Sequence, residues 1–229
     1  MNESLWSDVD RYLGDLLLPA DPVLEAALAD SAAAGLPAIQ VTATQGKLLM
    51  LLARMQGARR ILEIGTLGGY STIWMARALP KDGRLITLEV DPKHAEVARK
   101  NITRAGLADR VELRLGRALD ILPQLAAEGR GPFDLFFIDA NKPNNPEYFG
   151  WALKLSRKGS VIIVDNVIRN GAVINAASTD TDVLGTRRVL ELMAAEPRVS
   201  ATALQTVSGK GWDGFALAVV IEEPTAPLS

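Results

Sequence analysis

The sequence predicts an α/β fold with a largely parallel sheet, on three observations. From residue 60 onward, short runs of β-branched residues and leucine alternate with amphipathic segments of helical periodicity. Before residue 58 only helical periodicity is present, and after residue 198 two strand-like runs follow each other without a helix between them. The alternation is typical of βαβ units, and the last two runs indicate an antiparallel hairpin that completes the sheet.

Three helices are predicted before the first strand, and they form an N-terminal helical cap over residues 1–57. Leu, Val, Ala and Met recur at steps of three and four residues within 3–18, 21–34 and 43–56. These segments are bounded by Pro19, Gly35 and Gly57, which are typical helix-ending residues.

The core of the sheet is expected over residues 58–221. Strands are predicted near 60–64, 84–89, 110–115, 134–138 and 160–164, and helices near 70–79, 92–105, 118–128, 146–156 and 183–195. The hairpin strands are predicted at 199–207 and 213–221, joined by SGKGWD, and residues 222–229 form a frayed tail. No linker interrupts the pattern, so the 229 residues are expected to form a single domain.

The composition indicates a small-molecule partner. A formal net charge of −2 and a pI near 5.6 argue against a broad basic face for nucleic acid. No apolar run is long enough to cross a membrane and no signal segment is recognised, so we expect no membrane partner and a cytoplasmic location. Because cysteine is absent, disulfides and thiolate metal sites are excluded.

The single histidine and one modification motif carry little weight. His94 lies in a predicted helix with apolar partners at helical spacing, so it is expected to face solvent, which argues against histidine-based hydrolase and metal sites. Asn101-Ile102-Thr103 matches a glycosylation acceptor, but nothing else in the sequence indicates secretion.

The turn after the first predicted strand has the composition of a ligand-binding loop. In ILEIGTLGGYS, Gly65, Gly68 and Gly69 allow a tight turn, and Ser71 lies at the start of the next helix. Glu63 stands where a dinucleotide loop carries its first glycine, and its charge would repel a pyrophosphate. The stretch therefore favours a ligand with a cationic end, such as a sulfonium or an amino acid headgroup. The alternative is a plain strand-to-helix turn with an exposed glutamate.

Two further strand ends suit an adenosyl ligand without phosphates. Glu89 ends the second predicted strand, where a carboxylate can accept hydrogen bonds from both ribose hydroxyls. After the third strand, Gly116 and Ala118 are small enough to let an adenine ring approach the main chain, although close helix packing explains them equally well.

Polar residues at the ends of the fourth and fifth predicted strands suggest a divalent-cation site. FDLFFIDANK ends in Asp139 and Lys142, and in GSVIIVDNV a second buried run is followed by Asp165 and Asn166. Two carboxylates and an amide oxygen form a hard oxygen site that suits Mg²⁺, with Mn²⁺ or Ca²⁺ as alternatives. Each acid taken alone is better explained as a cap of the next helix or turn, but the occurrence of both on consecutive strands favours the cation site. Lys142 is either a solvated loop lysine or, beside a cation and partly desolvated, a base.

In combination, these motifs resemble the cation-dependent O-methyltransferases of the catechol and caffeoyl-CoA type, which use S-adenosylmethionine. The resemblance runs from about Val41 to the end, through LEIGTLGGYS, ALPKDGRLITLEVD, FFIDANK, VDNVIRNGAV and KGWDGFALA in that order. It implies a Rossmann-like class I methyltransferase fold, with a seven-stranded mostly parallel sheet, helices on both faces and commonly a homodimer. The five strands and the hairpin predicted above agree with it.

The resemblance also implies roles for individual residues. Lys142 matches the catalytic lysine, and the metal ligands match Asp139, Asp165 and Asn166. The residues matched to the cofactor are Val41 in IQVTATQG, Glu63, Gly65, Ser71, Glu89 and Ala118, to which the strand ends add Gly116 and Asp139. The implied reaction moves a methyl group from S-adenosylmethionine to one hydroxyl of a vicinal diol, such as a hydroxylated aromatic small molecule, with both oxygens on the metal.

Two positions depart from the family pattern, and the role of a third residue is open. Asn141 replaces an acid that many relatives carry, so we expect a changed loop shape with Asp139 kept as the metal ligand. Plant relatives place a tryptophan after the fifth strand, whereas this chain has Arg169, which either favours an acidic substrate or is a surface charge. Trp212 either lines the acceptor pocket or packs within the hairpin.

Two other classes of function remain as alternatives. One is a non-catalytic S-adenosylmethionine-binding or regulatory protein on the same fold, which the complete set Asp139, Lys142, Asp165 and Asn166 opposes. The other is an NAD-linked oxidoreductase, which Glu63 and the incomplete glycine pattern oppose.

Overall fold

The structure is a computed structural model that describes residues 3–223, and its main-chain contacts divide the chain into two compact units. The first unit spans residues 1–121 together with 208–210, and the second spans residues 122–207 together with 211–229. The predicted tail lies outside the described residues from position 224 onward. Among the described residues, no helix is long and apolar enough to cross a membrane.

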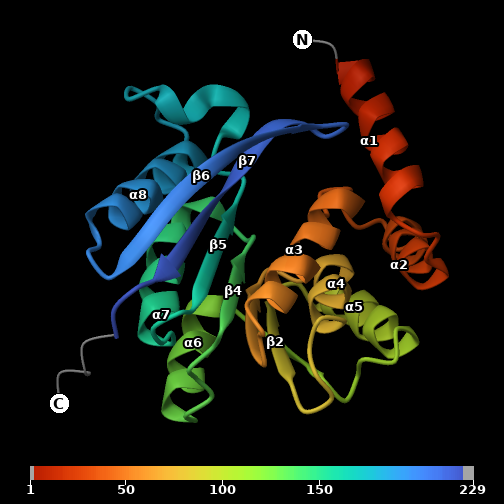
Figure 1. Cartoon of the computed structure of the whole chain (residues 1–229), viewed down its shortest axis with the longest axis horizontal. Coiled ribbons are helices and arrows are strands. Elements are labelled where there is room, and N and C mark those ends of the chain that lie inside the picture. Colours follow the sequence, from red (N-terminus) through yellow and green to blue (C-terminus); the bar gives the residue numbers. More distant parts are fainter. Residues whose placement is uncertain (1–2, 224–229) are drawn as a thin grey trace. The chain divides into compact units, whose positions relative to one another are not determined.

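The first unit begins with three helices, as the sequence predicts. Helix α1 spans Glu3–Leu17, α2 spans Pro22–Ala33 and α3 spans Ala43–Met55. Asp21 caps α2 by accepting the Leu24 N–H, and Thr42 caps α3 by accepting the Gln45 N–H. Figure 1 shows α1 running from the N-terminal end of the chain towards α2.

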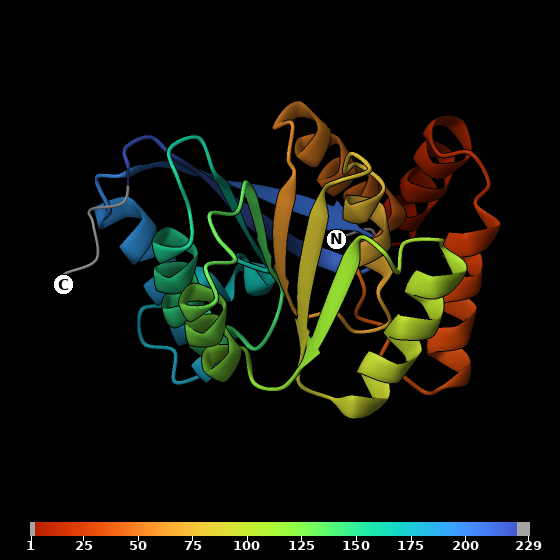
Figure 2. The same cartoon turned by 90° about the horizontal axis from the view of Figure 1, so that it is seen from below.

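Three parallel strands form the sheet of the first unit. Strands β1 (Arg60–Ile64), β2 (Arg84–Glu89) and β3 (Val111–Leu115) lie in the order β3-β2-β1. Helix α4 (Tyr70–Ala76) follows β1, α5 (Pro92–Arg104) follows β2 and α6 (Ala118–Ala127) follows β3. Figure 2 shows the three strands side by side in orange, yellow and light green, with α2 and α5 packed alongside each other.

Helix α4 is fully buried and is shorter than the sequence predicts. All seven of its residues are buried, and it ends at Ala76 instead of continuing to residue 79. The N–H groups of Ala78 and Leu79 donate to carbonyls three residues earlier, which is the tighter spacing of a 3₁₀ turn. Pro80 follows, and because proline has no N–H it cannot extend the helix.

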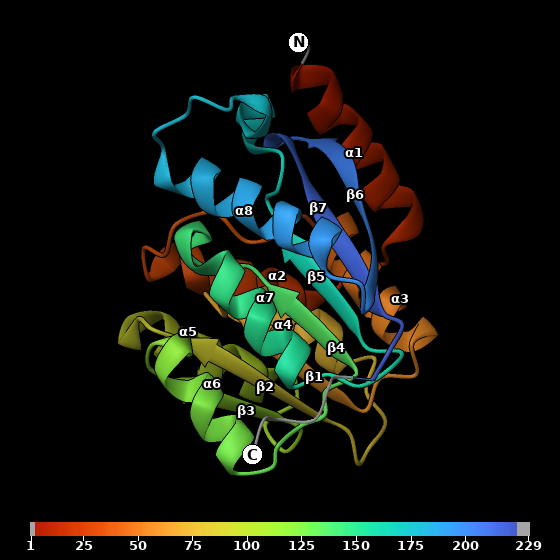
Figure 3. The ribbon, with the colours of Figure 1, turned by 90° about the vertical axis from the view of Figure 1, so that its left-hand side faces the viewer.

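The second unit contains the remaining four strands. Strands β4 (Leu135–Ile138) and β5 (Val161–Asp165) are parallel, and β5 pairs in antiparallel register with β7 (Gly211–Val220). Strand β6 (Val199–Ser208) lies beside β7 at the edge of the sheet. Helices α7 (Asn145–Lys154) and α8 (Thr181–Ala195) pack against each other, as Figure 3 shows, and α7 also contacts β4 and β5.

Short 3₁₀ helices and the hairpin turn differ from the predicted elements. The 3₁₀ helices η1 (Lys142–Asn144) and η2 (Arg169–Ile174) lie where no element is predicted. The hairpin turn is shorter than SGKGWD, because β6 continues to Ser208 and β7 begins at Gly211, which leaves a two-residue turn of a type common in hairpins. Trp212 therefore lies in β7 instead of in the turn.

All seven strands belong to one mixed sheet in the order β3-β2-β1-β4-β5-β7-β6. The predicted α/β fold and its C-terminal antiparallel hairpin are thus confirmed. The other predicted elements are present with ends shifted by at most about two residues, the usual uncertainty of helix and strand ends. Buried apolar runs such as Phe136–Ile138 and Ile162–Val164 form the continuous hydrophobic strands expected of a parallel sheet covered on both faces.

Candidate active site

Glu63, near the end of β1, is buried in a cluster of hydroxyl groups. Its carboxylate accepts hydrogen bonds from Ser71 Oγ at 2.6 Å, from Thr87 Oγ1 at 2.7 Å and from Thr72 Oγ1. Glu63 is 0% exposed, so the alternative of an exposed glutamate in a plain turn is wrong. The hydroxyl donors replace the water that a buried carboxylate loses, and they join β1, β2 and the first turn of α4.

Glu89, at the end of β2, holds the turn of residues 65–69, which we call the cofactor turn. Its Oε2 accepts the N–H groups of Thr66 at 3.2 Å and Leu67 at 2.7 Å. Its Oε1 accepts those of Val90 at 2.9 Å and Asp91 at 3.0 Å. The two carboxylate oxygens of Glu89 thus already accept hydrogen bonds from four main-chain N–H groups. Ribose hydroxyls that bind Glu89 would donate to these same oxygens. Glu89 therefore fixes the turn in addition to its predicted ribose contact.

His94 lies beside Glu89 and is not solvent-facing as predicted. Its Nδ1 is 3.7 Å from Glu89 Oε1, and its side chain is 22% exposed. The side chain is thus only partly exposed, because the first turn of α5 lies next to the end of β2. Asp91 caps this turn by accepting the N–H groups of Lys93 and His94.

Three other predicted cofactor residues follow strands of the first unit in the chain. Gly65 follows β1, and its N–H donates to the Leu88 carbonyl at 3.0 Å. Gly116 follows β3 with φ +144°, a conformation open to glycine, and donates to the Glu89 carbonyl at 2.7 Å. Ala118 begins α6. Because the strands are parallel, Gly65, Glu89 and Gly116 share one carboxyl edge, where ligands of such sheets bind.

Val41 lies in the segment between α2 and α3, and Lys210 holds this segment. The Lys210 Nζ donates to the Ala38 carbonyl at 3.4 Å and to the Gln40 carbonyl. Next to it, the Gly209 N–H donates to the Asp10 carboxylate of α1 at 2.8 Å. No pattern in the sequence indicates these contacts, since they join residues that are far apart along the chain.

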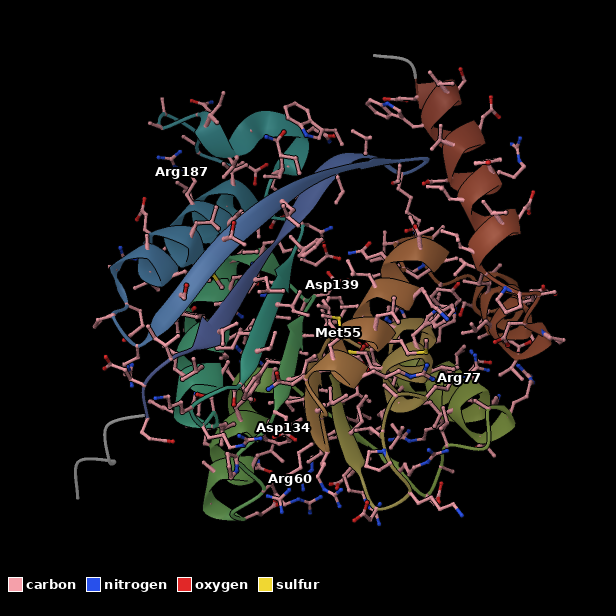
Figure 4. The ribbon with its side chains drawn as sticks, in the orientation of Figure 1. Met55, Arg60, Arg77, Asp134, Asp139 and Arg187 are labelled. Carbon is pink, nitrogen blue, oxygen red and sulfur yellow. The ribbon has the colours of Figure 1, made fainter. Side chains whose placement is uncertain are left out.

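In the second unit, Asp139 and Asp165 leave adjacent parallel strands at the same level. Ile138 pairs with Val164 in the β4–β5 register, so the two acids occupy the next position on their strands. Neighbouring strands lie about 4.8 Å apart, which brings both acids to one carboxyl edge. Figure 4 labels Asp139 at this end of β4 and Asp134 at the other.

Lys142 is buried and forms an ion pair with Asp139. Its Nζ lies 2.8 Å from Asp139 Oδ1, and the residue is 6% exposed. The alternative of a solvated loop lysine is therefore wrong. The 3₁₀ turn η1 carries Lys142, and Asn141 just before it accepts the Tyr148 hydroxyl of α7 at 2.5 Å. The residue that departs from the family pattern thus fastens the loop to α7.

The predicted metal ligands form a small set of oxygen donors. Asp165 is 4% exposed, and its Oδ1 accepts the N–H of Asn166 at 2.9 Å. Asn166 has φ +57°, a left-handed conformation that asparagine tolerates better than most residues. No group of three or more His, Cys, Asp or Glu side chains suited to a metal occurs among residues 3–223. Two carboxylates and one amide fit a hard cation whose other positions are filled by water or substrate oxygens.

Asp213 of β7 holds the segment after Asn166, and the sequence reasoning missed it. Its Oδ1 accepts the N–H groups of Ile168 at 3.0 Å, Arg169 at 3.1 Å and Gly214 at 2.9 Å. An acid among strand-forming residues in KGWDGF was the available signal, since such a residue needs partners when it is not fully solvated.

Arg169 and Trp212 are both engaged in contacts within the second unit. The Arg169 guanidinium lies 3.0 Å from the Asp182 carboxylate in the first turn of α8. The Trp212 indole N–H donates to Gln205 Oε1 at 3.0 Å, and its ring lies so close to Gly171 that a Cβ there would be 2.9 Å from it. Trp212 therefore packs within the hairpin and against η2.

The chain is similar to known proteins over nearly its whole length. The sequence model of the O-methyltransferase family matches residues 20–218. A catechol O-methyltransferase of Niastella koreensis is 58% identical over 96% of this chain and 100% of that protein. A catechol O-methyltransferase of Mycobacterium tuberculosis is 59% identical over 93% of this chain and 95% of that protein.

Solved structures give the same result. An O-methyltransferase of Bacillus cereus in complex with S-adenosylhomocysteine is 61% identical, with a TM-score of 0.94 over 95% of this chain and 99% of that chain. The O-methyltransferase TomG of Streptomyces achromogenes, in complex with S-adenosylmethionine, is 53% identical, with a TM-score of 0.93 over 96% and 99%. These similarities support neither the NAD-linked nor the non-catalytic alternative. The chain belongs to the O-methyltransferase family and is an S-adenosylmethionine-dependent O-methyltransferase with the class I methyltransferase fold.

Proposed function

We propose that this enzyme is a divalent-metal-dependent O-methyltransferase that methylates one hydroxyl of a vicinal diol in a catechol-like small molecule. The observation that carries the proposal is the register of Asp139 with Asp165 on neighbouring strands, with Asn166 next along the chain. Such ligands suit Mg²⁺, with Mn²⁺ or Ca²⁺ as alternatives, and leave positions for two substrate oxygens. The names of the two catechol O-methyltransferase relatives support the same substrate class.

Lys142 is the proposed general base. Its Nζ is held 2.8 Å from Asp139, at the edge of the sheet that carries the proposed ligands, where it can accept a proton from a substrate oxygen. The proton of one substrate hydroxyl passes to Nζ, and the oxygen electron pair forms the new bond to the methyl carbon as the carbon–sulfur bond breaks. When bound, S-adenosylmethionine supplies the methyl group and a divalent cation stabilises negative charge on the attacking oxygen.

The proposed cofactor contacts are Val41, Glu63, Gly65, Ser71, Glu89, Gly116 and Ala118, with Asp139 serving both cofactor and metal. Two observations support this set. Gly65, Glu89 and Gly116 share a carboxyl edge, and Glu63 brings buried negative charge that suits a cationic sulfonium. The relatives in complex with S-adenosylhomocysteine and S-adenosylmethionine support the identity of the ligand.

We also propose that each chain is one domain, with a helical cap at residues 1–57 and a core at 58–221, and that two copies form a homodimer. The face of α1 supports the dimer. No residue of α1 is buried, and Leu5, Val9, Tyr12 and Leu16, at helical spacing, are between 46% and 65% exposed. A second copy would cover this apolar stripe. Analytical ultracentrifugation tests the proposed dimer. Tyr12→Asp is expected to convert dimers to monomers, and a wild-type protein that sediments as a monomer would contradict the proposal.

A comparison of acceptors tests the proposed function. The enzyme, S-adenosylmethionine and Mg²⁺ are incubated with catechol or with phenol, and S-adenosylhomocysteine is measured. Catechol is expected to be methylated and phenol not, because only a vicinal diol chelates the cation through two oxygens. Equal rates with both acceptors, or cofactor binding without transfer to any vicinal diol, contradict the proposal.

A further inference from the structure

The amide of Asn101 joins the cofactor turn to helix α2. Asn101 lies on α5 and is 0% exposed. Its Nδ2 donates to the carbonyl oxygen of Gly68 at 2.9 Å and to that of Ala27 at 3.3 Å. Gly68 belongs to the cofactor turn and Ala27 to α2, so one side chain on a third element bridges the two. Burial of this residue also explains why the glycosylation motif that begins at Asn101 is not available as an acceptor.

The orientation of the amide follows from its partners. Both groups near Nδ2 are carbonyl oxygens, which only accept, and Oδ1 lies 3.0 Å from the Arg104 guanidinium, which only donates. A flipped amide would place an oxygen against two oxygens. The position therefore requires a donor, and aspartate, although it has the same shape, would reverse the interaction and bury a charge.

Helix α2 also packs directly on the cofactor turn. A Cβ at Gly68 would lie 2.0 Å from the Ser31 hydroxyl of α2 and 3.2 Å from the Ser31 Cβ, so the turn packs closely on the helix at a residue without a side chain. That hydroxyl donates to the Ala27 carbonyl at 2.7 Å, the same oxygen that accepts from Asn101. Hydrogen bonding and packing thus join the same two segments.

Asn101 differs from the other group that holds the turn. Glu89 binds the N–H groups of Thr66 and Leu67 from the end of β2, within the sheet core. Asn101 binds the opposite kind of group, the Gly68 carbonyl, and its second bond reaches the helical cap. The segment after α2 carries Val41, so a displacement of α2 reaches two parts of the proposed cofactor contacts.

We propose that Asn101 is a positioning residue that couples α2 to the cofactor turn, so that the bound cofactor and the cap helix stabilise each other. The inference rests on the cofactor contacts of the proposed function and involves neither the metal nor the acceptor. The coupling free energy is the same in both directions. Cofactor binding should therefore stabilise α2 against local opening by the same free energy by which an ordered α2 strengthens cofactor binding.

Calorimetric titration with S-adenosylhomocysteine, in buffer with EDTA, tests the coupling in the wild type, Asn101→Asp and Asp30→Asn. Asp30→Asn is the matched control, because it breaks the ion pair between α2 and Arg104 of α5 and leaves both Nδ2 bonds in place. Asn101→Asp is expected to raise the Kd about 5- to 150-fold, the usual range for coupling between sites. The control is expected to stay within about 2-fold, as exposed ion pairs contribute little.

Two further measurements separate coupling from a general loss of stability. Because a buried aspartate can prevent folding, Asn101→Ala is measured as well, since it removes both bonds without adding a charge. In the wild type, hydrogen exchange is followed with and without S-adenosylhomocysteine. Amides of α2 are expected to gain protection together with the cofactor turn, whereas α1, which has no buried residue, serves as the internal reference.

The outcomes are distinct. Unchanged Kd values in folded Asn101 variants, even with lowered melting temperatures, give Asn101 a structural role only and overturn the inference. Exchange in α2 that does not respond to S-adenosylhomocysteine also overturns it. If the wild type itself fails to bind S-adenosylhomocysteine, the proposed cofactor contacts fail instead.

Discussion

Gly185 of α8 lies directly against the main chain of Lys142. A Cβ built at Gly185 would lie 2.2 Å from the Lys142 carbonyl oxygen and 2.7 Å from its carbonyl carbon. Main-chain atoms cannot rotate away as the end of a flexible side chain can. The helix therefore approaches the η1 turn this closely because residue 185 has no side chain.

Gly185→Ala is expected to lower kcat more than it lowers stability. Overpacking costs about 1–3 kcal/mol, whereas a misplacement of about 1 Å in an active site can lower a rate about 100-fold. The kcat with catechol and the melting temperature measure the two effects. The matched control is Gly150→Ala on α7, where nothing lies within 4 Å of the added Cβ. Retained kcat in Gly185→Ala would show that Lys142 tolerates the displacement.

Replacement of the proposed base separates chemistry from cofactor binding. Lys142→Met is expected to lower kcat by about 10²- to 10⁴-fold, the usual contribution of a general base. The Kd for S-adenosylhomocysteine should stay the same, because Lys142 is not among the proposed cofactor contacts. Lys154→Met is the control, since this lysine lies exposed on α7 over the Trp151 ring. A loss of less than about 3-fold in Lys142→Met would remove the lysine from the mechanism.

Substitutions at Arg169 and at its partner Asp182 distinguish two roles for this arginine, which are binding of an acidic substrate and a structural ion pair. If the ion pair only fastens the segment to α8, Arg169→Gln and Asp182→Asn should have equal effects, each within about 1 kcal/mol of stability. We expect equal effects on stability. In both variants, the KM for catechol and the KM for 3,4-dihydroxybenzoate should change by the same modest factor. A KM increase confined to the carboxylated acceptor, and to Arg169→Gln alone, would instead assign Arg169 to substrate binding.

The parts of this protein that could be predicted from its sequence lie within single continuous stretches. Apolar runs such as Leu135–Ile138 are buried strands, and an acid directly after such a run is at the carboxyl edge, so Asp139 could be placed in advance. The hydroxyl partners of Glu63 could not, because Thr72 and Thr87 lie on two different elements.

Contacts that depend on close packing could not be predicted from the sequence either. Nothing in the pattern around Gly185 distinguishes it from any glycine in a helix, yet it adjoins Lys142. No element is predicted over η2, because residues with positive φ, such as Arg169 and Asn170, have no clear sequence signal. Asp213 on a different strand holds this segment by accepting main-chain N–H groups.

Asp21 forms an ion pair with Arg77, the residue of the pair that Figure 4 labels. This ion pair predicts a pH dependence of stability. The side-chain hydrogen bond from Arg77 lowers the pKa of the Asp21 carboxyl, and burial opposes this only in part. Because the folded pKa is lowered, the ionised carboxylate stabilises the fold above the unfolded value of about 3.9, and this contribution is lost as the pH falls through the folded pKa.

Asp21→Asn isolates this effect, because asparagine still caps α2 but carries no charge. Urea midpoints measured from pH 7 down to about pH 2 are expected to fall more steeply for the wild type than for the variant below about pH 4. The difference in urea midpoint between the wild type and Asp21→Asn should therefore become smaller as the pH falls. A constant difference across the whole range would show that the charge of Asp21 contributes nothing.

Removal and return of the metal is the direct test of whether methyl transfer depends on a divalent cation. The enzyme is treated with EDTA, the chelator is removed, and the rate of methyl transfer from S-adenosylmethionine to catechol is measured as Mg²⁺ is added back. We expect no transfer after EDTA, a rate that rises to saturation with Mg²⁺ in the wild type, and almost no recovery in Asp165→Ala, which lacks one proposed ligand. Full activity after EDTA, or equal recovery in Asp165→Ala, would contradict it.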